Sequence, residues 1–458
     1  MLILKKYFGT DGIRRVANTG LTPELAYKVA KAGAYVLAKH ASNTPTILIG
    51  RDTRLSGNLI ESAMIAGFLS YGANVKVLGV IPTPAVAYLT KKLGADAGVV
   101  ISASHNSFEF NGIKFFSNKG MKIPDSIEEE IEEIMDSEKL NDLNASDDKI
   151  GISENKEEMI SDYEEFIVQI FEKSIYDKLP SEFKVVIDTA NGATYKIAEK
   201  IFTRLGIEFK IINNNPNGIN INKDCGSTHL EMLKEYVTSN KYNLGIAYDG
   251  DGDRCLAVDE NGNEINGDIM LAILSKYLKE ENALKKDTVV ATVMSNLGLD
   301  IYCKNNNLNL EKTNVGDRYV LEEMLNKGYT LGGEQSGHII FLDYNPTGDG
   351  ILTSLMLIRS MVKYNKKASE LASIIDIYPQ VLVNAKVALD KKYLYKEDSE
   401  ITKMIQEVEE KLKNEGRVLI RPSGTEPLVR VMLEGKNIDK ITQYANDIAQ
   451  IIEKKSNL

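Results

Sequence analysis

Three short apolar runs in this 458-residue chain each end directly in a polar motif. Residues 97–101 (AGVVI) run into SASHN at 102–106, residues 243–248 (NLGIAY) run into DGDGDR at 249–254, and a third run ends at GGE, 332–334. Apolar runs of this length between polar turns are typical of buried strands. Ligands of open α/β sheets bind at the carboxyl ends of the strands. The sequence therefore predicts three strand-end loops that face one cleft.

Strand-like and helix-like patterns alternate over most of the chain, which predicts α/β units. Strands are expected at 46–49, 75–78, 184–188, 209–212 and 288–293, and helices at 59–68, after Gly192, at 269–278 and from Asp317. Residues 228–231 (THLE) have the spacing of a helix capping box. The acidic stretch 125–165 is expected to be a solvated helix and a connector.

The character of the sequence changes in its last part, where 381–387 and 428–433 alternate like antiparallel strands and each precedes an amphipathic helix. The predicted architecture is three mixed α/β domains of similar topology and a smaller C-terminal α+β domain. The expected boundaries are 1–157, 158–257, 258–374 and 375–458.

Composition narrows the function classes. A net charge of −10 argues against nucleic acid as the main partner, because a phosphate backbone requires a basic face. No apolar stretch approaches the ~20 residues of a membrane span, and the first residues do not resemble a secretory signal. Cys225, Cys255 and Cys303 are far apart and form no Cys-x-x-Cys pair, so no disulfide framework or zinc site is expected. These features predict a cytoplasmic protein with a small-molecule ligand.

The motif at 249–254 places Asp249, Asp251 and Asp253 two residues apart, so that their carboxylates can converge on one cation. Oxygen ligands favour Mg²⁺, Ca²⁺ or Mn²⁺. A calcium loop of the EF-hand type is a rival interpretation, but that loop requires glycine where this chain has Arg254, and its flanks here are predicted strands. A purely structural turn is the other alternative.

Two further motifs are ambiguous when taken alone. Ser104 beside His105 is a candidate nucleophile or an ordinary turn, and the Gly-x-Ser-x-Gly elbow of hydrolases is absent. The stretch 421–427 (RPSGTEP) offers a guanidinium, two hydroxyls and backbone amides that suit a phosphate, but Pro, Ser and Gly also make common turns. No Walker-type loop is present.

Five motifs in one order are more specific than any one of them. FGTDGIR at 8–14, SASHN at 102–106, DGDGDR at 249–254, GGEQSGH at 332–338 and RPSGTEP at 421–427 together resemble the α-D-phosphohexomutase superfamily over essentially the whole chain. Within it, residues 225–229 (CGSTH) and 315–318 (VGDR) also point to the branch that acts on glucosamine phosphates.

The resemblance implies four domains around a central cleft and a resting enzyme phosphorylated on Ser104. Mg²⁺, one per active site, would be held by Asp249, Asp251, Asp253 and the phosphate on Ser104. The enzyme would convert glucosamine 6-phosphate into glucosamine 1-phosphate through glucosamine 1,6-bisphosphate, for the amino-sugar pathway that supplies peptidoglycan precursors. Phosphomannomutase or phosphoglucomutase activity is the alternative, and a non-catalytic phosphosugar-binding protein or a phosphatase is a more distant one.

The same resemblance assigns roles to single residues. Arg14 and Arg254 would add positive charge at the transferred phosphoryl group, and His105 or Lys114 would act as the general base, the lysine only if its pKa is lowered. The substrate would be bound by Glu334, Ser336, His338, Arg421, Ser423, Gly424, Thr425 and Arg430. Arg15 and Ser107 depart from the family pattern, in which glycine and proline are usual. Whether the chain is a homodimer, and whether a kinase or autophosphorylation first modifies Ser104, stays open.

Overall fold

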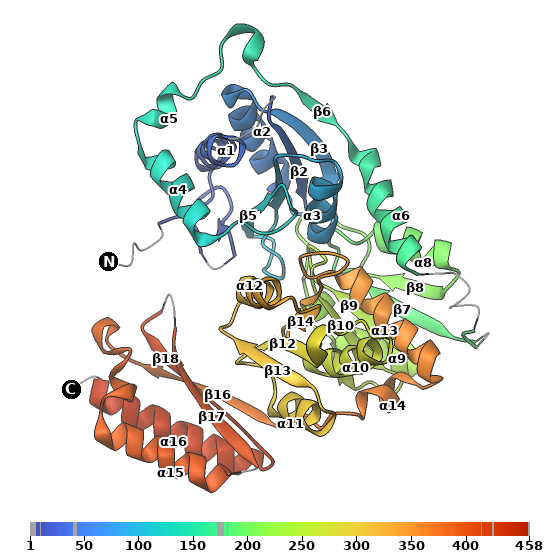
Figure 1. Cartoon of the computed structure of the whole chain (residues 1–458), viewed down its shortest axis with the longest axis vertical. Coiled ribbons are helices and arrows are strands. Elements are labelled where there is room, and N and C mark those ends of the chain that lie inside the picture. Colours follow the sequence, from blue (N-terminus) through green and yellow to red (C-terminus); the bar gives the residue numbers. More distant parts are fainter. Residues whose placement is uncertain are drawn as a thin grey trace. The chain divides into compact units, whose positions relative to one another are not determined.

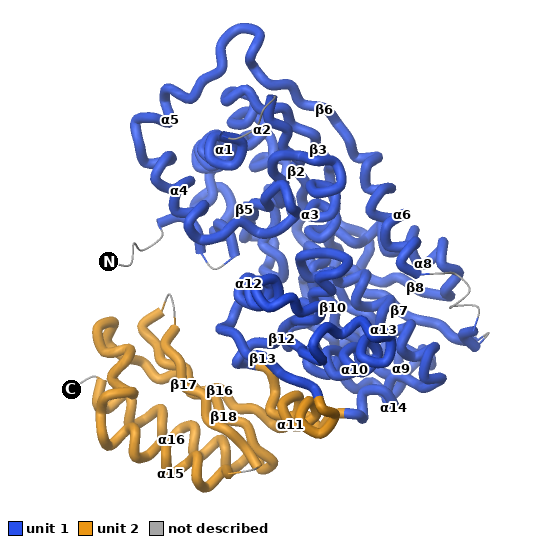
Figure 2. Tube along the Cα trace, in the orientation of Figure 1, with its two compact units in different colours: residues 1–294, 308–374 blue, residues 295–307, 375–458 orange. Residues whose placement is uncertain are grey.

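The computed structural model describes residues 6–9, 11–39, 44–171, 178–180, 182–413, 415–423 and 426–456. The chain forms two compact units (Figure 2). Unit 1 contains residues 1–294 and 308–374, and unit 2 contains residues 295–307 and 375–458. Unit 1 carries three of the four sheets, and unit 2 carries the fourth.

The first sheet of unit 1 has the strand order β1-β5-β4-β2-β3-β6. Figure 1 labels its strands β5, β2, β3 and β6. Its strands are β1 (Ile13–Val16), β2 (Thr46–Arg51), β3 (Asn74–Val80), β4 (Ala97–Ile101), β5 (Phe110–Ser117) and β6 (Ser153–Asn155). β2, β3, β4 and β6 are parallel, whereas β5 runs antiparallel to β1 and β4. The sheet packs with α1 (Pro23–Ala38), α2 (Gly57–Tyr71), α3 (Thr83–Lys92) and α4 (Asp125–Asp136), and α5 (Lys139–Asp142) follows.

The second sheet has the order β11-β10-β9-β7-β8, and the third has the order β13-β12-β14-β15. The strands of the second are β7 (Lys184–Asp188), β8 (Glu208–Ile212), β9 (Leu244–Tyr248), β10 (Cys255–Asp259) and β11 (Glu264–Ile265). Those of the third are β12 (Thr288–Thr292), β13 (Asn309–Thr313), β14 (Leu331–Gly333) and β15 (Ile339–Phe341). In each, a parallel set is extended by antiparallel strands.

The helices of this part of unit 1 are α6 (Ile160–Ile170), α8 (Ile197–Leu205), α9 (Glu231–Ser239), α10 (Gly267–Glu280), α12 (Asp317–Lys327), α13 (Gly350–Tyr364) and α14 (Ala368–Ala372). Buried aliphatic side chains of β7, β9 and β10 pack against α9, and those of β12 and β15 pack against α12. Each sheet is thus fixed by its own core, which leaves the loops at the strand ends to carry polar groups.

Unit 2 contains a three-stranded antiparallel sheet, β16-β18-β17, with β16 (Gln380–Lys386), β17 (Gly416–Pro422) and β18 (Leu428–Gly435). One face packs on α15 (Ser399–Leu412) and α16 (Ile438–Ser456) through alternate apolar residues such as Val429, Val431 and Leu433. Helix α11 (Leu297–Asn305) also belongs to this unit. The predicted fold class, three mixed α/β domains and a smaller C-terminal domain, is confirmed.

Two local predictions are wrong. No capping box forms at 228–231, because residues 226–228 make a 3-10 turn anchored by the bond from the Gly226 amide to Asp188, and α9 begins at Glu231 without a side-chain cap. The acidic helix α4 is not simply solvated. Glu128 and Glu132 are buried, and Glu132 accepts the backbone amides of residues 6, 7 and 8, which ties the FGTDGIR segment to this helix.

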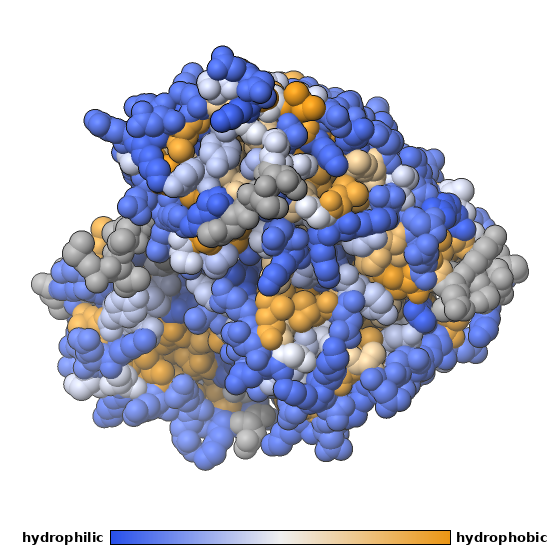
Figure 3. Space-filling view, turned by 45° about the horizontal axis from the view of Figure 1, so that its top comes forward, coloured by the Kyte–Doolittle hydropathy of each residue, from blue (hydrophilic) through white to orange (hydrophobic). Residues whose placement is uncertain are grey.

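Hydrophilic residues cover most of the face shown in Figure 3, with smaller hydrophobic patches between them. Among the described residues, no helix is both long and apolar enough to cross a lipid bilayer. Cys225, Cys255 and Cys303 are buried free thiols.

Candidate active site

The loops that follow β4 and β9 meet at Ser104. Its hydroxyl donates a 2.6 Å hydrogen bond to Oδ2 of Asp249, and Nδ1 of His105 lies 3.4 Å from the same hydroxyl. Ser104 is buried and has a φ of +50°, in the left-handed region that non-glycine residues rarely adopt. Such backbone strain persists only where surrounding contacts enforce it, and it is concentrated at functional sites.

Three carboxylates form the floor of this site. One oxygen from each of Asp249, Asp251 and Asp253 lies within 4.8 Å of the others, and all three side chains are buried. Oδ1 of Asp251 and Oδ1 of Asp253 are buried and have no hydrogen-bond partner among the described residues. Burial and the two neighbouring aspartates raise the pKa of Asp249 well above its usual value. Clustered carboxylates with unpartnered oxygens fit a hard divalent cation, which would offset their mutual repulsion.

Lysines and acids continue the cluster toward the FGTDGIR segment. Nζ of Lys114 lies 3.1 Å from Asp251, 3.2 Å from Asp11 and 3.6 Å from Asp253. Lys122 bridges Asp11, at 2.5 Å, and Asp317. This network of ion pairs connects residues near the first sheet of unit 1 to residues near its third sheet, and it surrounds the carboxylates of the aspartate cluster.

Lys114 does not meet the condition set for its role as a base, because its pKa is not lowered. Burial alone would lower it, but the carboxylates of Asp11, Asp251 and Asp253 outweigh burial and raise it well above the usual value. The positive charge of Arg14 does not dominate the pKa of Lys114, because the Arg14 guanidinium is paired with Asp11. By contrast, burial, with the positive charges of Arg254 and Arg14, lowers the pKa of His105 to about 4.

The loop after β14 contributes Glu334, Ser336 and His338. The amide of Gly348 donates to Nε2 of His338 at 2.9 Å, which leaves Nδ1 to face Asp253 at 3.7 Å. Oγ of Ser336 is buried and finds no hydrogen-bond partner within the part of the chain that the structure describes, and Glu334 accepts the amide of Gly316 at 3.2 Å. Ser336 is thus the member of this loop with an unfilled polar atom, as expected of a ligand contact.

In unit 2, Arg421 and Arg430 lie directly opposite each other on β17 and β18. Like charges in a cross-strand pair repel, which favours an anion between them. Nζ of Lys392 donates to the carbonyl of Ser423 at 2.9 Å, adding a third cation at this turn. Gly424 and Thr425, also predicted to bind phosphate, lie outside the described residues.

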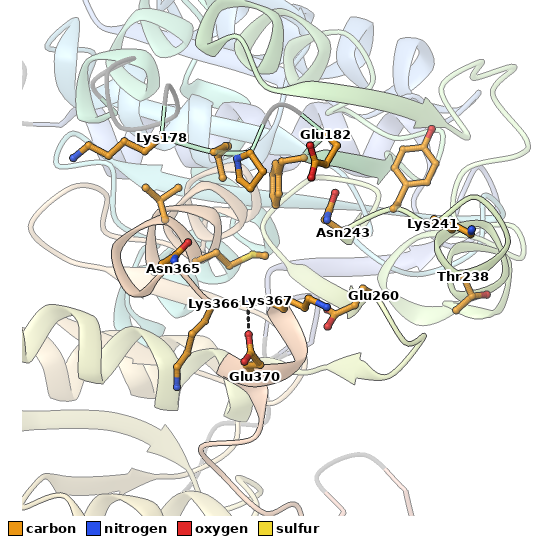
Figure 4. A pocket seen from close by; sticks show the side chains of 16 residues that line it. Lys178, Glu182, Thr238, Lys241, Asn243, Glu260, Asn365, Lys366, Lys367 and Glu370 are labelled. Atoms are coloured by element: carbon orange, nitrogen blue, oxygen red, sulfur yellow. Dashed lines mark hydrogen bonds between the residues drawn. The ribbon is translucent and has the colours of Figure 1, made fainter.

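A separate pocket of about 530 Å³ in unit 1 contains none of these groups. Figure 4 shows its side chains, among them Lys241, Lys366, Glu260 and Glu370. Two of its acids are already used within the protein, since Glu260 accepts from Ser369 and Glu370 accepts the Lys367 amide. The aspartate cluster, and not this pocket, therefore brings predicted site residues together.

Several residues of the site had no predicted role. Asp11 and Asp317 stand within motifs that the sequence already singled out, so their acidic character was an available signal. Arg54 and Asn222 both donate to the carbonyl of Ser104. These two residues and Lys122 gave no such signal, because a lone lysine, arginine or asparagine is common in loops. Arg318 pairs with Asp125 and Glu128 of α4, which accounts for part of the acidic stretch.

Family models match nearly the whole chain. The four parts of the phosphoglucomutase/phosphomannomutase model match residues 5–142 (α/β/α domain I), 161–262 (domain II), 266–378 (domain III) and 382–451 (C-terminal domain). The chain therefore belongs to the phosphoglucomutase/phosphomannomutase family, the phosphohexomutases, and is an enzyme.

Its relatives place it more narrowly, among the phosphoglucosamine mutases. It is 55% identical over 448 residues to the phosphoglucosamine mutase of Ruminiclostridium cellulolyticum, covering 98% of this chain and 99% of the relative. It is also 55% identical to that of Clostridium beijerinckii over 452 residues, covering 99% of this chain and 100% of the relative.

Solved structures share the fold at low identity. A phosphoglucomutase/phosphomannomutase family protein from Burkholderia thailandensis matches with a TM-score of 0.81 and 21% identity, covering 100% of this chain and 98% of that one. N-acetylphosphoglucosamine mutase from Aspergillus fumigatus, in complex with GlcNAc-6P and magnesium, matches with a TM-score of 0.71 and 16% identity, covering 98% and 96%.

Proposed function

We propose that this enzyme interconverts glucosamine 6-phosphate and glucosamine 1-phosphate by carrying a phosphoryl group on Ser104. The observation that carries the proposal is the 2.6 Å bond from the Ser104 hydroxyl to Asp249, within a cluster of three buried carboxylates. The names of the relatives at 55% identity support the choice of sugar.

In the proposed reaction the sugar hydroxyl attacks phosphorus as the bond from phosphorus to Oγ of Ser104 breaks. The hydroxyl proton passes to a base, and glucosamine 1,6-bisphosphate forms. Oγ, which leaves as an oxyanion, takes up a proton. In the return transfer Oγ gives up this proton to a base and attacks the phosphorus of the 6-phosphate, while the bond from that phosphorus to O6 of the sugar breaks and O6 is protonated. Such transfers depend on positioning and on neutralising charge more than on covalent chemistry.

Asp249, Asp251 and Asp253 would hold Mg²⁺, which when bound would polarise the phosphoryl oxygens. His105 is the better-placed base, since it adjoins Ser104, whereas Lys114 is held by three carboxylates. Arg254 has a buried Nε without a hydrogen-bond partner and is suited to the transferred phosphoryl group.

Glu334 and Ser336 would bind sugar hydroxyls, and His338 would hold this loop against Asp253. Arg421, Ser423, Gly424, Thr425 and Arg430 would bind the phosphate that is not reacting. Because one fixed phosphate site then serves both ends of the bisphosphate, the intermediate must turn over between the two transfers.

The decisive test is Ser104→Ala, with Ser107→Ala on the same loop as the matched control. Peptide mapping by mass spectrometry should find one phosphoryl group on Ser104 of the wild type. Ser104→Ala should lose at least ~1,000-fold in kcat, the scale of removing a covalent route, while Ser107→Ala stays within about twofold. Near-normal turnover by Ser104→Ala would exclude the phosphoserine mechanism.

The sugar is tested separately, by kcat/KM for glucosamine, glucose and mannose 6-phosphates with a bisphosphate activator present. Glucosamine 6-phosphate should lead by at least ~10-fold, the effect of about 1.4 kcal/mol in the transition state. A lead by mannose or glucose phosphate would assign the other branch of the family and leave the phosphoserine mechanism intact.

A further inference from the structure

Arg54 lies behind the Ser104 loop and is completely enclosed. It follows β2, and its side chain has no exposed surface. Nε donates to Oδ2 of Asp52 at 2.8 Å, and the two Nη atoms donate to backbone carbonyls of the loop.

The carbonyls that Arg54 binds are spread between Ser104 and Phe110, along the loop that carries the nucleophile Ser104. Nη2 donates to Ser104 at 2.9 Å and to Asn106 at 2.8 Å, and Nη1 donates to Phe110 at 3.1 Å and to Ser107. A guanidinium has five N–H donors. All five therefore have acceptors. Three of these acceptors, the carbonyls of Ser104, Asn106 and Ser107, lie in the loop between β4 and β5, and a fourth belongs to Phe110, the first residue of β5.

A second side chain binds two of the same carbonyls. Nδ2 of Asn222 donates to the carbonyl of Ser104 at 2.8 Å and to that of Asn106 at 3.0 Å. Asn222 comes from the segment before the 3-10 turn at 226–228, and its own amide is fixed by a 2.9 Å bond to the carbonyl of Ala190. The Ser104 loop is thus fixed by Arg54, which follows a strand of the first sheet, and by Asn222, which lies between strands of the second sheet.

Ser102 completes the arrangement. Its hydroxyl accepts the amide of Ser104 at 2.9 Å and donates to Asp52 at 2.6 Å. Both backbone groups of Ser104 are therefore occupied by hydrogen bonds. This leaves its hydroxyl to face Asp249 and supports the left-handed φ of the residue.

We infer that Arg54, with Asn222, is a positioning residue for phosphoryl transfer at Ser104, an inference that rests on the proposed function. Its geometric role is to hold the carbonyls of Ser104, Asn106, Ser107 and Phe110 so that Oγ stays directed at the aspartate cluster. Its electrostatic role is to offset the negative ends of these four carbonyl dipoles, which would otherwise repel the dianionic phosphate.

The test compares Arg54→Lys and Asn222→Ala with wild type, with Arg51→Lys as the control. Lysine keeps the charge but loses the planar fork. Arg51 stands at the end of the same strand and bonds to Glu61 and the carbonyl of Asp52, but to no carbonyl of the loop.

Arg54→Lys should lower kcat by ~30-fold or more with KM within about threefold, and Asn222→Ala should lower kcat by ~5-fold or more, because both act on the aligned transition state rather than on binding. The rate at which the phosphate on Ser104 is lost to water should also change. This rate is measured by intact mass spectrometry after the substrate has been removed. Arg51→Lys should stay within about twofold in both measurements.

A wild-type kcat and phosphate lifetime in Arg54→Lys would overturn the inference. If Arg54→Lys does not fold, Asn222→Ala decides, and a kcat within twofold of wild type overturns it. The outcomes separate from those of the proposed function: activity in Ser104→Ala removes both ideas, whereas an inactive Ser104→Ala with fully active Arg54→Lys and Asn222→Ala removes only this one.

Discussion

Gly250→Ala tests how closely the aspartate loop and the Ser104 loop must approach. A Cβ at Gly250 would lie 2.6 Å from the carbonyl oxygen of Ser104, 2.8 Å from Nδ2 of Asn222 and 2.9 Å from Cδ1 of Ile221. Two of these three atoms belong to the hydrogen bond that fixes the Ser104 carbonyl. The substitution therefore forces apart the two loops that supply the nucleophile and the carboxylates.

The size of the effect follows from these distances. Real Cβ contacts are essentially never under 3.0 Å, so the Ser104 carbonyl must move by at least 0.4 Å, the difference between 3.0 and 2.6. Overpacking of this kind costs about 1–3 kcal/mol of stability. A displacement of about 1 Å at reacting groups costs up to ~100-fold in rate, so a loss of roughly 10- to 100-fold in kcat is expected.

The assay is the initial rate of interconversion of glucosamine 6-phosphate and glucosamine 1-phosphate, with thermal unfolding measured on the same samples. Gly328→Ala is the control, because its Cβ meets nothing within 4 Å and the substitution costs only the strain of a φ of +71°. It should lose about 1–2 kcal/mol of stability and keep its activity. If Gly250→Ala keeps kcat within twofold, the tight approach of the two loops is not needed for catalysis.

Three further predictions concern the metal, the phosphate site and pH. Chelation should abolish activity and Mg²⁺ should restore it, and Asp251→Asn should raise the Mg²⁺ concentration for half-activity by ~10-fold or more; activity in metal-free buffer would contradict this. Arg421→Ala should raise KM by ~10-fold or more, because a charged hydrogen bond worth about 1.5–3 kcal/mol is lost. The unfolding midpoint should not fall, because the substitution also removes the repulsion between Arg421 and Arg430. An unchanged KM would count against the phosphate site. Burial raises the pKa of Asp349 to about 6, above its unfolded value of about 3.9, so its contribution to stability is full below pH ~4 and is lost as pH rises through ~6. The unfolding free energy of wild type relative to Asp349→Asn in urea should therefore grow by about 2–3 kcal/mol from pH 7 to pH 4, and a pH-independent difference would refute the shift.

Residue types and their periodicity are local properties of the sequence. The strands and loops that depend on these local properties were therefore predictable. The strand at 97–101 is observed at those residues, and the strands before Asp249 and Glu334 end where the apolar runs end. The aspartates of the DGDGDR loop converge because alternate residues of a tight turn point to the same side. The β17 strand, Gly416–Pro422, was not predicted, and its last two residues, Arg421 and Pro422, belong to the motif that was interpreted as a phosphate loop.

The partners of each charge depended on the tertiary structure. Lys122 and Asp317 are 195 residues apart in sequence and Glu132 lies 124 residues from the amide of Phe8 that it accepts, yet both pairs are in direct contact. The condition that the pKa of Lys114 be lowered is not met, because Arg14 is paired with Asp11 while three carboxylates lie near the amine.

The sequence by itself determined the three mixed α/β domains with a smaller C-terminal domain, the strand-end loops and the polar residue types that each loop carries, because strand period, turn residues and acid spacing act over a few residues. Only the tertiary structure decided that Arg54 and Asn222 hold the Ser104 loop, that Glu128 and Glu132 are buried, and that Ser104 faces Asp249. Those outcomes are set by hydrogen bonds and ion pairs between segments that meet only once the sheets have packed, and no local pattern specifies such a partner.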